Sequence, residues 1–228
     1  MEIKLLGAGA VQPGLAKVLE AFRKECGGEV EVSYATAPAL RQRLGEGERA
    51  DLIIAPPDVI DDLVKTGKIR QGDRAPLGRI GIGVAIRAGA PVPEIGTVEE
   101  FKRALLVAES IVYNQASTGL YLEKLFERLG IGEQIRSKTT RYPDFAAVRD
   151  HIANGKGSEI GLGATTVIVE SANKGLQFAG PLPADLQNYT AYHAAVIPGS
   201  AIEDAATALL HYLQSSGSKA LLKTAGIE

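Results

Sequence analysis

The fold is decided by one stretch of the sequence, Ser110-Ile111-Val112-Tyr113-Asn114-Gln115-Ala116-Ser117-Thr118-Gly119-Leu120-Tyr121. A short apolar run at 111–113 predicts a strand, and a polar turn then leads into a helix predicted to begin at about Ser117. The first N–H groups of a helix have no partner within the helix and lie at the positive end of its dipole. Amide and hydroxyl side chains at 114–118 add further donors. The stretch therefore predicts a site for an anion.

The same residues also have a purely structural interpretation. Serine and threonine are common N-cap residues, so a Ser-Thr pair before an amphipathic helix can be no more than a cap. The sequence leaves both interpretations open.

Composition and charge exclude several classes of protein. The chain has 228 residues, of which 45% are hydrophobic, enough for the cores of two small α/β domains. There are 25 basic and 27 acidic residues, mixed along the chain, and no basic stripe of the kind that binds nucleic acid. The single cysteine, Cys26, cannot form an internal disulfide, so either redox compartment is compatible with the chain. We expect a soluble protein with no nucleic-acid partner.

Targeting signals are not evident. No apolar run approaches the roughly 18 residues that span a bilayer, so no membrane insertion is expected. The chain starts in a predicted strand, without the basic and apolar regions of a signal peptide. We expect a cytoplasmic protein as the sequence stands, or a periplasmic one if a leader has been removed.

The first 65 residues predict three strand-helix units. Strands at 3–6, 30–34 and 50–55 are each followed by a turn and a helix, the second with Pro38 in its first turn. Such units build a parallel sheet that binds ligands at the carboxyl ends of its strands, so the turns at 7–12 and 35–38 should be neighbours. The Gly-Ala-Gly-Ala turn lacks the third glycine of a dinucleotide fingerprint, and no acidic residue follows the next strand. We expect no cofactor.

The second half of the chain repeats this pattern between two long β segments. A β segment at 77–86 that contains three glycines is expected to cross into a second lobe. A second long β segment, at 188–197, is expected to return beside 80–86. Between them, Thr97 with Glu100 predicts a capping box, and 138–142 an edge strand. Residues 165–172 are predicted to be helical from their position, although their β-branched residues favour a strand. The predicted lobes are 1–80 with 195–228, and 81–194, with a ligand cleft between them.

This pattern resembles a known fold. Over essentially its full length the chain resembles the type II periplasmic-binding-protein fold, and within it the molybdate-binding-protein-like branch of ABC-transporter receptors. The resemblance is carried by 34–36, 44–55, 118–121 and 159–163. It implies two α/β lobes, each a mostly parallel sheet flanked by helices and joined by two β crossings. It also implies a monomer that closes on a small anion, with an ABC permease as partner if the protein is exported.

The residues at the ligand positions of this family differ here. Molybdate receptors place hydroxyl donors where this chain has Ala10, Ala37 and, at about the same place, Ala164, whereas Thr118 replaces an alanine. Each missing hydrogen bond to a charged group costs roughly 1.5–3 kcal/mol. The differences argue against a tetrahedral oxyanion and favour a larger organic carboxylate, which planar guanidinium groups bind well. Arg41 and Arg43 lie near the second predicted turn, Arg141 lies near the predicted helix at 144–153, and Arg149 lies on that helix. Most arginines, however, are solvated surface residues.

The sequence contains few candidate catalytic residues. The three histidines are scattered, and no metal-ligand spacing or nucleophile elbow is present. A solute-binding protein is therefore the favoured function. The alternative is an isomerase of a small unsaturated polycarboxylate, because aconitate-isomerase-like members resemble the same branch. That chemistry needs a proton carrier, for which Tyr142, Tyr189 and His193 stay open. The predicted ligand-binding residues are Gly9, Ala10, Val11, Thr36, Ala37, Arg41, Asn114, Gln115, Ser117, Thr118, Gly119, Tyr142, Ala164 and Thr165.

Overall fold

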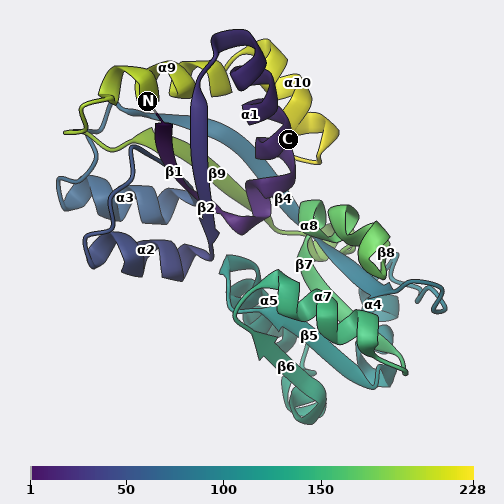
Figure 1. The fold of residues 1–228 in the computed structure, drawn as a ribbon. Helices are drawn as coiled ribbons and strands as arrows, with labels where there is room; N and C mark the ends of the chain where they lie inside the picture. Colours follow the sequence, from purple (N-terminus) through teal and green to yellow (C-terminus); the bar gives the residue numbers. More distant parts are fainter. Residues whose placement is uncertain (1) are drawn as a thin grey trace. The chain divides into compact units, whose positions relative to one another are not determined.

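A computed structural model describes residues 2–228 and divides the chain into two compact units (Figure 1). Unit 1 combines the chain up to Ile80 with Ala191–Glu228, and unit 2 is Gly81–Thr190. The chain passes between the units twice, within strand β4 (Arg74–Arg87) and within strand β9 (Tyr189–Val196).

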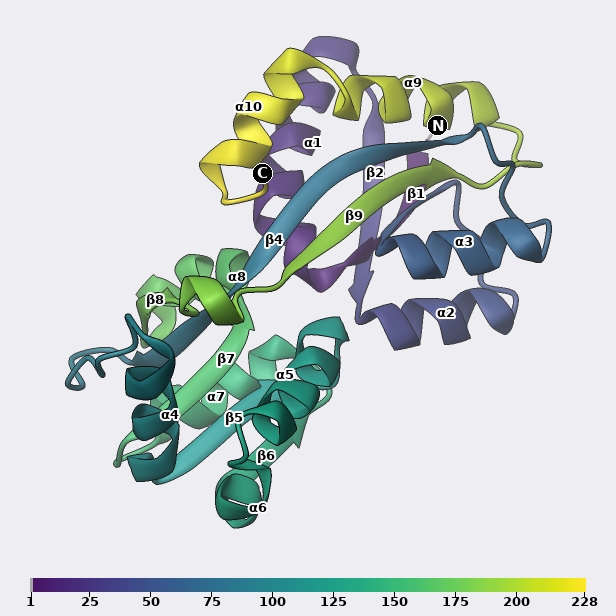
Figure 2. The same cartoon turned by 180° about the vertical axis from the view of Figure 1, so that it is seen from behind.

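Unit 1 is a sheet with helices on both faces. The strand order is β2-β1-β3-β9-β4, in which β1 pairs in parallel with β2 and β3, and β9 pairs antiparallel with β3. Helices α1, α9 and α10 pack together on one face, and α2 and α3 lie on the other (Figures 1 and 2). The bounds are β1 Glu2–Ala8, β2 Glu29–Ala35, β3 Leu52–Ala55, α1 Gln12–Cys26, α2 Ala37–Gly45, α3 Pro57–Lys65, α9 Glu203–Leu213 and α10 Ser216–Thr224.

The hydrophobic pattern explains this arrangement. Helix α1 buries Leu15, Val18 and Phe22 along one stripe, and all four residues of β3 are buried in the middle of the sheet. Strand β2 lies at the edge and exposes Glu29 and Glu31, charges that discourage pairing with another chain.

Unit 2 is a second sheet built from β4, β5, β6, β7 and β8. The order is β4-β7-β5-β6, and β8 pairs with β4 off this path. Strand β5 is parallel to β6 and β7, whereas β4 is antiparallel to β7 and β8. The bounds are β5 Ser110–Asn114, β6 Thr139–Tyr142, β7 Glu159–Ala164, β8 Leu176–Pro181, α4 Val98–Val107, α5 Ser117–Arg128, α6 Gly132–Ile135, α7 Phe145–Asn154 and α8 Thr165–Glu170.

Each face of the unit 2 sheet has its own core. Helices α4, α5 and α6 cover one face with residues such as Phe101, Leu122 and Phe126. Helices α7 and α8 cover the other with Val148 and Ile168. Short 3-10 helices complete the chain at Gly9–Val11, Arg136–Lys138, Ser171–Lys174 and Ala184–Leu186.

Most of the predicted elements are present. The capping box of α4 is confirmed, with both Thr97 and Glu100 side chains in place, and so are the edge position of β6 and the helix at 165–170. One prediction about pairing is wrong in its register. Strand β9 neighbours β4 as predicted, but within β4 Ile82–Ala85 pair with β7 and Gly83–Arg87 pair with β8. Because both β7 and β8 pair along 83–85, β9 cannot run beside these residues as expected.

Candidate anion-binding edges

The carboxyl ends of three strands meet at one edge of unit 1. Ala8 of β1 pairs with Ala35 of β2, so the turn at 9–11 lies beside Thr36, which confirms that the first two predicted turns are neighbours. Strand β3 ends at Ala55, opposite His193 of β9. The predicted residues of this unit, from Gly9 to Ala37, therefore lie at a single edge of its sheet.

A corresponding edge exists in unit 2. Asn114 at the end of β5 pairs with Tyr142 at the end of β6, and the Gln115 N–H donates to the Tyr142 carbonyl at 2.8 Å. Tyr113 pairs with Leu162 of β7, which places Ala164 and the following Thr165 at the same edge. Helix α5 begins directly after the β5 turn. The structure thus brings together every predicted site residue of this unit at the edge where α5 starts.

Most of the helices that begin at these two edges lack side-chain caps. The N-cap residues of α1, α5 and α8 are Val11, Ala116 and Ala164, which cannot accept a hydrogen bond through their side chains. Thr36 is the N-cap of α2 but makes no side-chain capping bond. Helix α7, which follows β6 at the unit 2 edge, is capped by Asp144. Of the remaining helices, α4 and α10 are capped by Thr97 and Ser215, whereas α6 and α9 have no side-chain cap.

This pattern bears on the two interpretations of the Ser-Thr pair. Ser117 and Thr118 lie inside the first turn of α5, after the N-cap, so neither residue is the cap. Thr118 is buried with 8% of its surface exposed, and Ser117 is half-buried. The Asn114 Oδ1 atom is buried and has no hydrogen-bond partner among residues 2–228. The turn therefore keeps uncommitted N–H, hydroxyl and amide groups next to one another.

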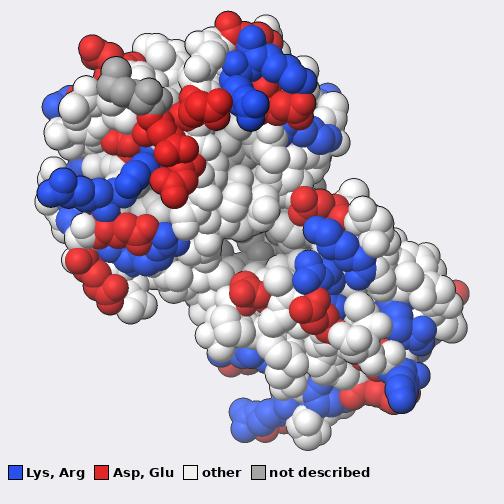
Figure 3. Space-filling model, in the orientation of Figure 1, with Lys and Arg blue, Asp and Glu red and all other residues white. Residues whose placement is uncertain are grey.

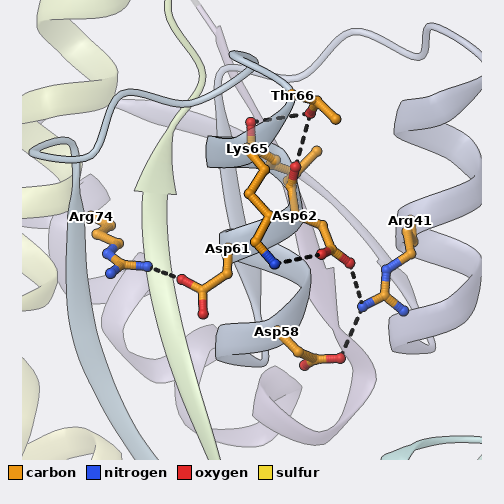
Figure 4. Close-up of polar contacts among 8 residues, drawn as sticks. Arg41, Asp58, Asp61, Asp62, Lys65, Thr66 and Arg74 are labelled. Atoms are coloured by element: carbon orange, nitrogen blue, oxygen red, sulfur yellow. Dashed lines mark hydrogen bonds and ion pairs between the residues drawn. The ribbon is translucent and has the colours of Figure 1, made fainter.

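The arginines are less available than the sequence suggested. The Arg41 guanidinium, on α2, lies 2.9 Å from Asp58 and 3.1 Å from Asp62 of α3 (Figure 4). Arg43 bonds to Glu48 and to the Ser33 hydroxyl. The remaining two pair within unit 2, Arg141 with Glu123 at 2.6 Å and Arg149 with Asp150 at 2.8 Å. All four thus have intramolecular carboxylate partners, and Arg41 stays a predicted ligand residue only if a ligand displaces them.

Tyr142 reaches the edge with its backbone rather than its hydroxyl. Its hydroxyl lies 2.9 Å from His151 Nδ1 on α7, and the other ring nitrogen of His151 lies 2.9 Å from the Ser110 hydroxyl. The Tyr142 ring packs against the core under α7. Both nitrogens of His151 are therefore engaged, and the Tyr142 phenol is directed away from the α5 turn.

His193 is the histidine at the unit 1 edge. Its side chain is half-buried, and its Nδ1 atom is buried without a hydrogen-bond partner among the described residues. Burial, and then the Arg74 guanidinium, lower the pKa of His193, while Asp61 of α3 opposes them in part. Arg74 and Asp61 are themselves ion-paired (Figure 4). The sequence predicted that His193 lies in a crossing strand. Its position opposite Ala55 depends on how β9 pairs with β3, which the sequence alone does not reveal.

The lowered pKa of His193 predicts a pH-dependent stability. The unfolded histidine, with a pKa of about 6.5, binds a proton that the folded one does not, so the free energy of unfolding rises with pH in this interval. We expect it to fall as the pH drops below about 6.5 toward the folded pKa. Urea unfolding at pH 7.5 and 5.5 measures the change, and His193→Gln should reduce it. An equal loss in the wild type and the variant would contradict the prediction.

Three other features of the described residues concern metal ligands, helix length and surface charge. No group of three or more His, Cys, Asp or Glu side chains in residues 2–228 is arranged to hold a metal ion. None of the helices in that range is long and apolar enough to cross a membrane. On the face shown in Figure 3, basic and acidic side chains are interspersed rather than segregated.

A groove of about 780 Å³ lies elsewhere in unit 1. It is lined by Lys4 at the start of β1, by Asp51 just before β3, and by Ile197 just after β9. These positions mark the edge of the sheet opposite to the one where α1 and α2 begin, and no predicted site residue lines the groove. We therefore place the candidate site at the uncapped helix starts.

Two α/β units, each with the carboxyl ends of its parallel strands at one edge of its sheet, define the two-lobe type II periplasmic-binding-protein fold. The chain belongs to the family described as "Bacterial extracellular solute-binding protein", whose profile matches residues 3–228. Its structural neighbours are molybdate-binding-like periplasmic proteins, as the sequence resemblance predicted.

Two solved structures and one sequence relative illustrate the similarity. The periplasmic molybdate-binding protein of Azotobacter vinelandii is 17% identical with a TM-score of 0.82, covering 99% of this chain and 98% of that one. The sulfate-binding protein SubI of Mycobacterium tuberculosis H37Rv is 18% identical with a TM-score of 0.80, covering 100% and 86%. An aconitate isomerase of a Pseudomonas species is 29% identical over 232 residues, which cover 99% of this chain and 87% of that protein.

Proposed function

We propose that the protein binds a small organic carboxylate at the uncapped helix starts of its two sheets. The single observation that supports this most strongly is the state of the α5 start. Its N-cap, Ala116, makes no side-chain capping bond, and the buried Asn114 Oδ1 atom beside it has no hydrogen-bond partner among residues 2–228. Helices α1, α2, α3 and α8 also begin at the carboxyl edges without a side-chain cap, whereas α7, which follows β6, is capped by Asp144. An uncapped helix start is stabilised by an external anion, which supplies the missing acceptors and complements the dipole.

The side chains at these edges favour a carboxylate over a tetrahedral oxyanion. By the family resemblance, Ala10, Ala37 and Ala164 stand where molybdate receptors have hydroxyl donors for their oxyanion. Thr118 supplies one hydroxyl, and the Asn114 amide can accept as well as donate hydrogen bonds. A ligand with separate carboxylate groups can use the N–H groups of the helix starts without requiring a closed ring of hydroxyls.

Thermal melts test the ligand class. The panel is molybdate, sulfate, phosphate, citrate and cis- and trans-aconitate, each in large excess. A ligand at a hundred times its Kd stabilises by about 2.7 kcal/mol, worth roughly 5–10 °C for a chain of this size. We expect shifts with the tricarboxylates and none with molybdate or sulfate. A shift confined to the inorganic oxyanions would reverse the proposed ligand class.

The variant Thr118→Val tests the site. Valine keeps the shape of threonine but removes its hydroxyl, and a hydrogen bond to a charged group is worth about 1.5–3 kcal/mol. We expect the affinity for the hit from the panel to fall by about tenfold or more, measured by isothermal titration. Thr139→Val is the control, because the Thr139 hydroxyl donates to the Ile135 carbonyl, at the opposite end of β6 from Tyr142. Equal affinities of Thr118→Val and the wild type would remove Thr118 from the site.

A second candidate function is isomerisation of an unsaturated polycarboxylate on the same site. It is favoured by one comparison, since the aconitate isomerase relative is 29% identical over 99% of this chain. Proton NMR of trans-aconitate incubated with the protein distinguishes a bound ligand from a converted one. If the ligand is bound but not converted, we propose that this protein, when exported to the periplasm, delivers the ligand to an ABC permease. We propose that it does so as a monomer.

A further inference from the structure

We infer that His193 is the proton carrier of the unit 1 edge, taking a proton from one carbon of an unsaturated polycarboxylate and returning it to another. This inference rests on the second candidate function above. It makes a choice that the sequence left open between Tyr142, Tyr189 and His193.

The register of the unit 1 sheet places His193 beside the predicted carboxylate-binding turns. The last residues of β1 and β2, Ala8 and Ala35, pair with each other. Gly7 of β1 pairs with Ile54 of β3, and the next residue of β3, Ala55, pairs with His193. His193 therefore lies at the same edge of the sheet as the ends of β1, β2 and β3. Neighbouring strands are about 4.8 Å apart, so β9 lies two strands, or about 10 Å, from β1. In the proposed complex, one carboxylate of a six-carbon tricarboxylate lies at the turn after β1 and its CH₂ group is directed along this edge toward His193.

The surroundings of His193 leave it able to accept a proton. Nδ1 is buried without a partner among the described residues, and the residue as a whole is half-buried. Two charged groups act on the ring, Arg74 from β4 and Asp61 from α3, and they are paired with each other. Because the Asp61 carboxylate is paired with the Arg74 guanidinium, it does little to hold a proton on His193. The imidazole is therefore neutral near pH 7, and the neutral imidazole is the form that acts as a base.

The other two candidates belong to unit 2. The Tyr142 hydroxyl bonds to His151, whose second nitrogen bonds to Ser110. Tyr189 lies at the start of β9 in unit 2, with 44% of its surface exposed, and not at the unit 1 edge. His211 lies exposed in the last turn of α9, a helix that packs with α1 and α10 rather than with α2 and α3.

The proton shift balances without any co-reactant. A C–H bond of the CH₂ group breaks and its proton passes to the imidazole, while the electron pair delocalises over the neighbouring double bond and carboxylate. The N–H groups of the helix starts stabilise the added negative charge. The imidazolium then protonates the far carbon of the allylic system, the double bond moves by one position, and His193 is neutral again.

The test separates binding from proton transfer. We incubate wild type, His193→Gln and His211→Gln with trans-aconitate in D₂O, follow deuterium incorporation and conversion by proton NMR, and measure thermal shifts on the same samples. Loss of a general base slows a reaction by typically 10²–10⁴-fold. We expect His193→Gln to keep the thermal shift and lose at least a hundredfold in exchange, and His211→Gln to match the wild type.

A pH profile adds a readout that a merely structural role would not change. Arg74→Gln removes a cation that lowers the pKa of His193, so the acid limb of the exchange rate should move to higher pH. Exchange within threefold of the wild type in His193→Gln overturns the inference. So does a wild type that binds trans-aconitate without exchange or conversion, an outcome that leaves the proposed binding function intact. Absence of any thermal shift overturns the binding function as well.

Discussion

Gly119→Ala is expected to destabilise unit 2 and to displace the start of α5. A Cβ atom at this position would lie 2.1 Å from the Asn114 carbonyl oxygen and 3.1 Å from Cδ2 of the Tyr113 ring. The closer atom belongs to the backbone of β5 and cannot move aside as a flexible side chain can. Overpacking of this kind costs about 1–3 kcal/mol, more than the gain of about 1 kcal/mol that alanine normally brings to a helix. Urea denaturation of both proteins measures the difference.

The matched control for this prediction is Gly132→Ala in the same unit. Gly132 begins α6, and the nearest atom to an added Cβ is 3.8 Å away, an ordinary contact. This variant should unfold within about 0.5 kcal/mol of the wild type. Because Thr118 precedes Gly119, the shifted helix start should also weaken ligand binding in Gly119→Ala. Wild-type stability of that variant would show that α5 does not pack on β5 this closely.

The sequence was sufficient to predict which turns lie at the carboxyl edges of the two sheets, because the residues of each strand and the following turn determine where the next helix begins. A strand that ends in small or amide residues and is followed by an amphipathic helix, as at 110–121, places that helix start at the carboxyl end of the strand whatever the rest of the chain does. The parallel pairing of Ala8 with Ala35 followed from the same repeated unit. Even α8, whose β-branched residues favour a strand, is helical because it follows β7 and covers the sheet with Ile168.

The sequence was insufficient wherever a role depends on a partner far along the chain. Arg41 was predicted to be a ligand residue from its distance to a turn, yet its acceptors, Asp58 and Asp62, lie on the next helix. The phenol of Tyr142 is directed toward His151, nine residues later, because α7 folds back over β6. No pattern within one element reveals such pairs. The absence of a cap on α5 was likewise hidden, since it depends on the N-cap being Ala116 rather than Ser117.

Ala116→Asp is expected to make the protein more stable and to weaken its binding of anions. Ala116 has the extended backbone (φ −100°, ψ −175°) of an N-cap residue, so a carboxylate there can accept from the free N–H groups of the first turn of α5. Replacing alanine by aspartate at an N-cap adds about 0.5–2 kcal/mol, helped by the helix dipole. The same carboxylate occupies the donors that we assign to the ligand and repels its charge. The affinity for the carboxylate ligand should therefore fall by more than the tenfold loss expected for Thr118→Val.

The companion variant Ala116→Asn separates the two causes of that loss. Asparagine caps a helix about as well as aspartate but carries no charge, so it should give a similar gain in the free energy of unfolding. It should weaken binding less than aspartate, and only aspartate should show a loss of affinity that shrinks as salt screens the repulsion. Urea denaturation and isothermal titration at two salt concentrations measure both quantities. If both variants are more stable and bind with wild-type affinity, the first turn of α5 does not hold the ligand, and the assignment of the anion site to this edge fails.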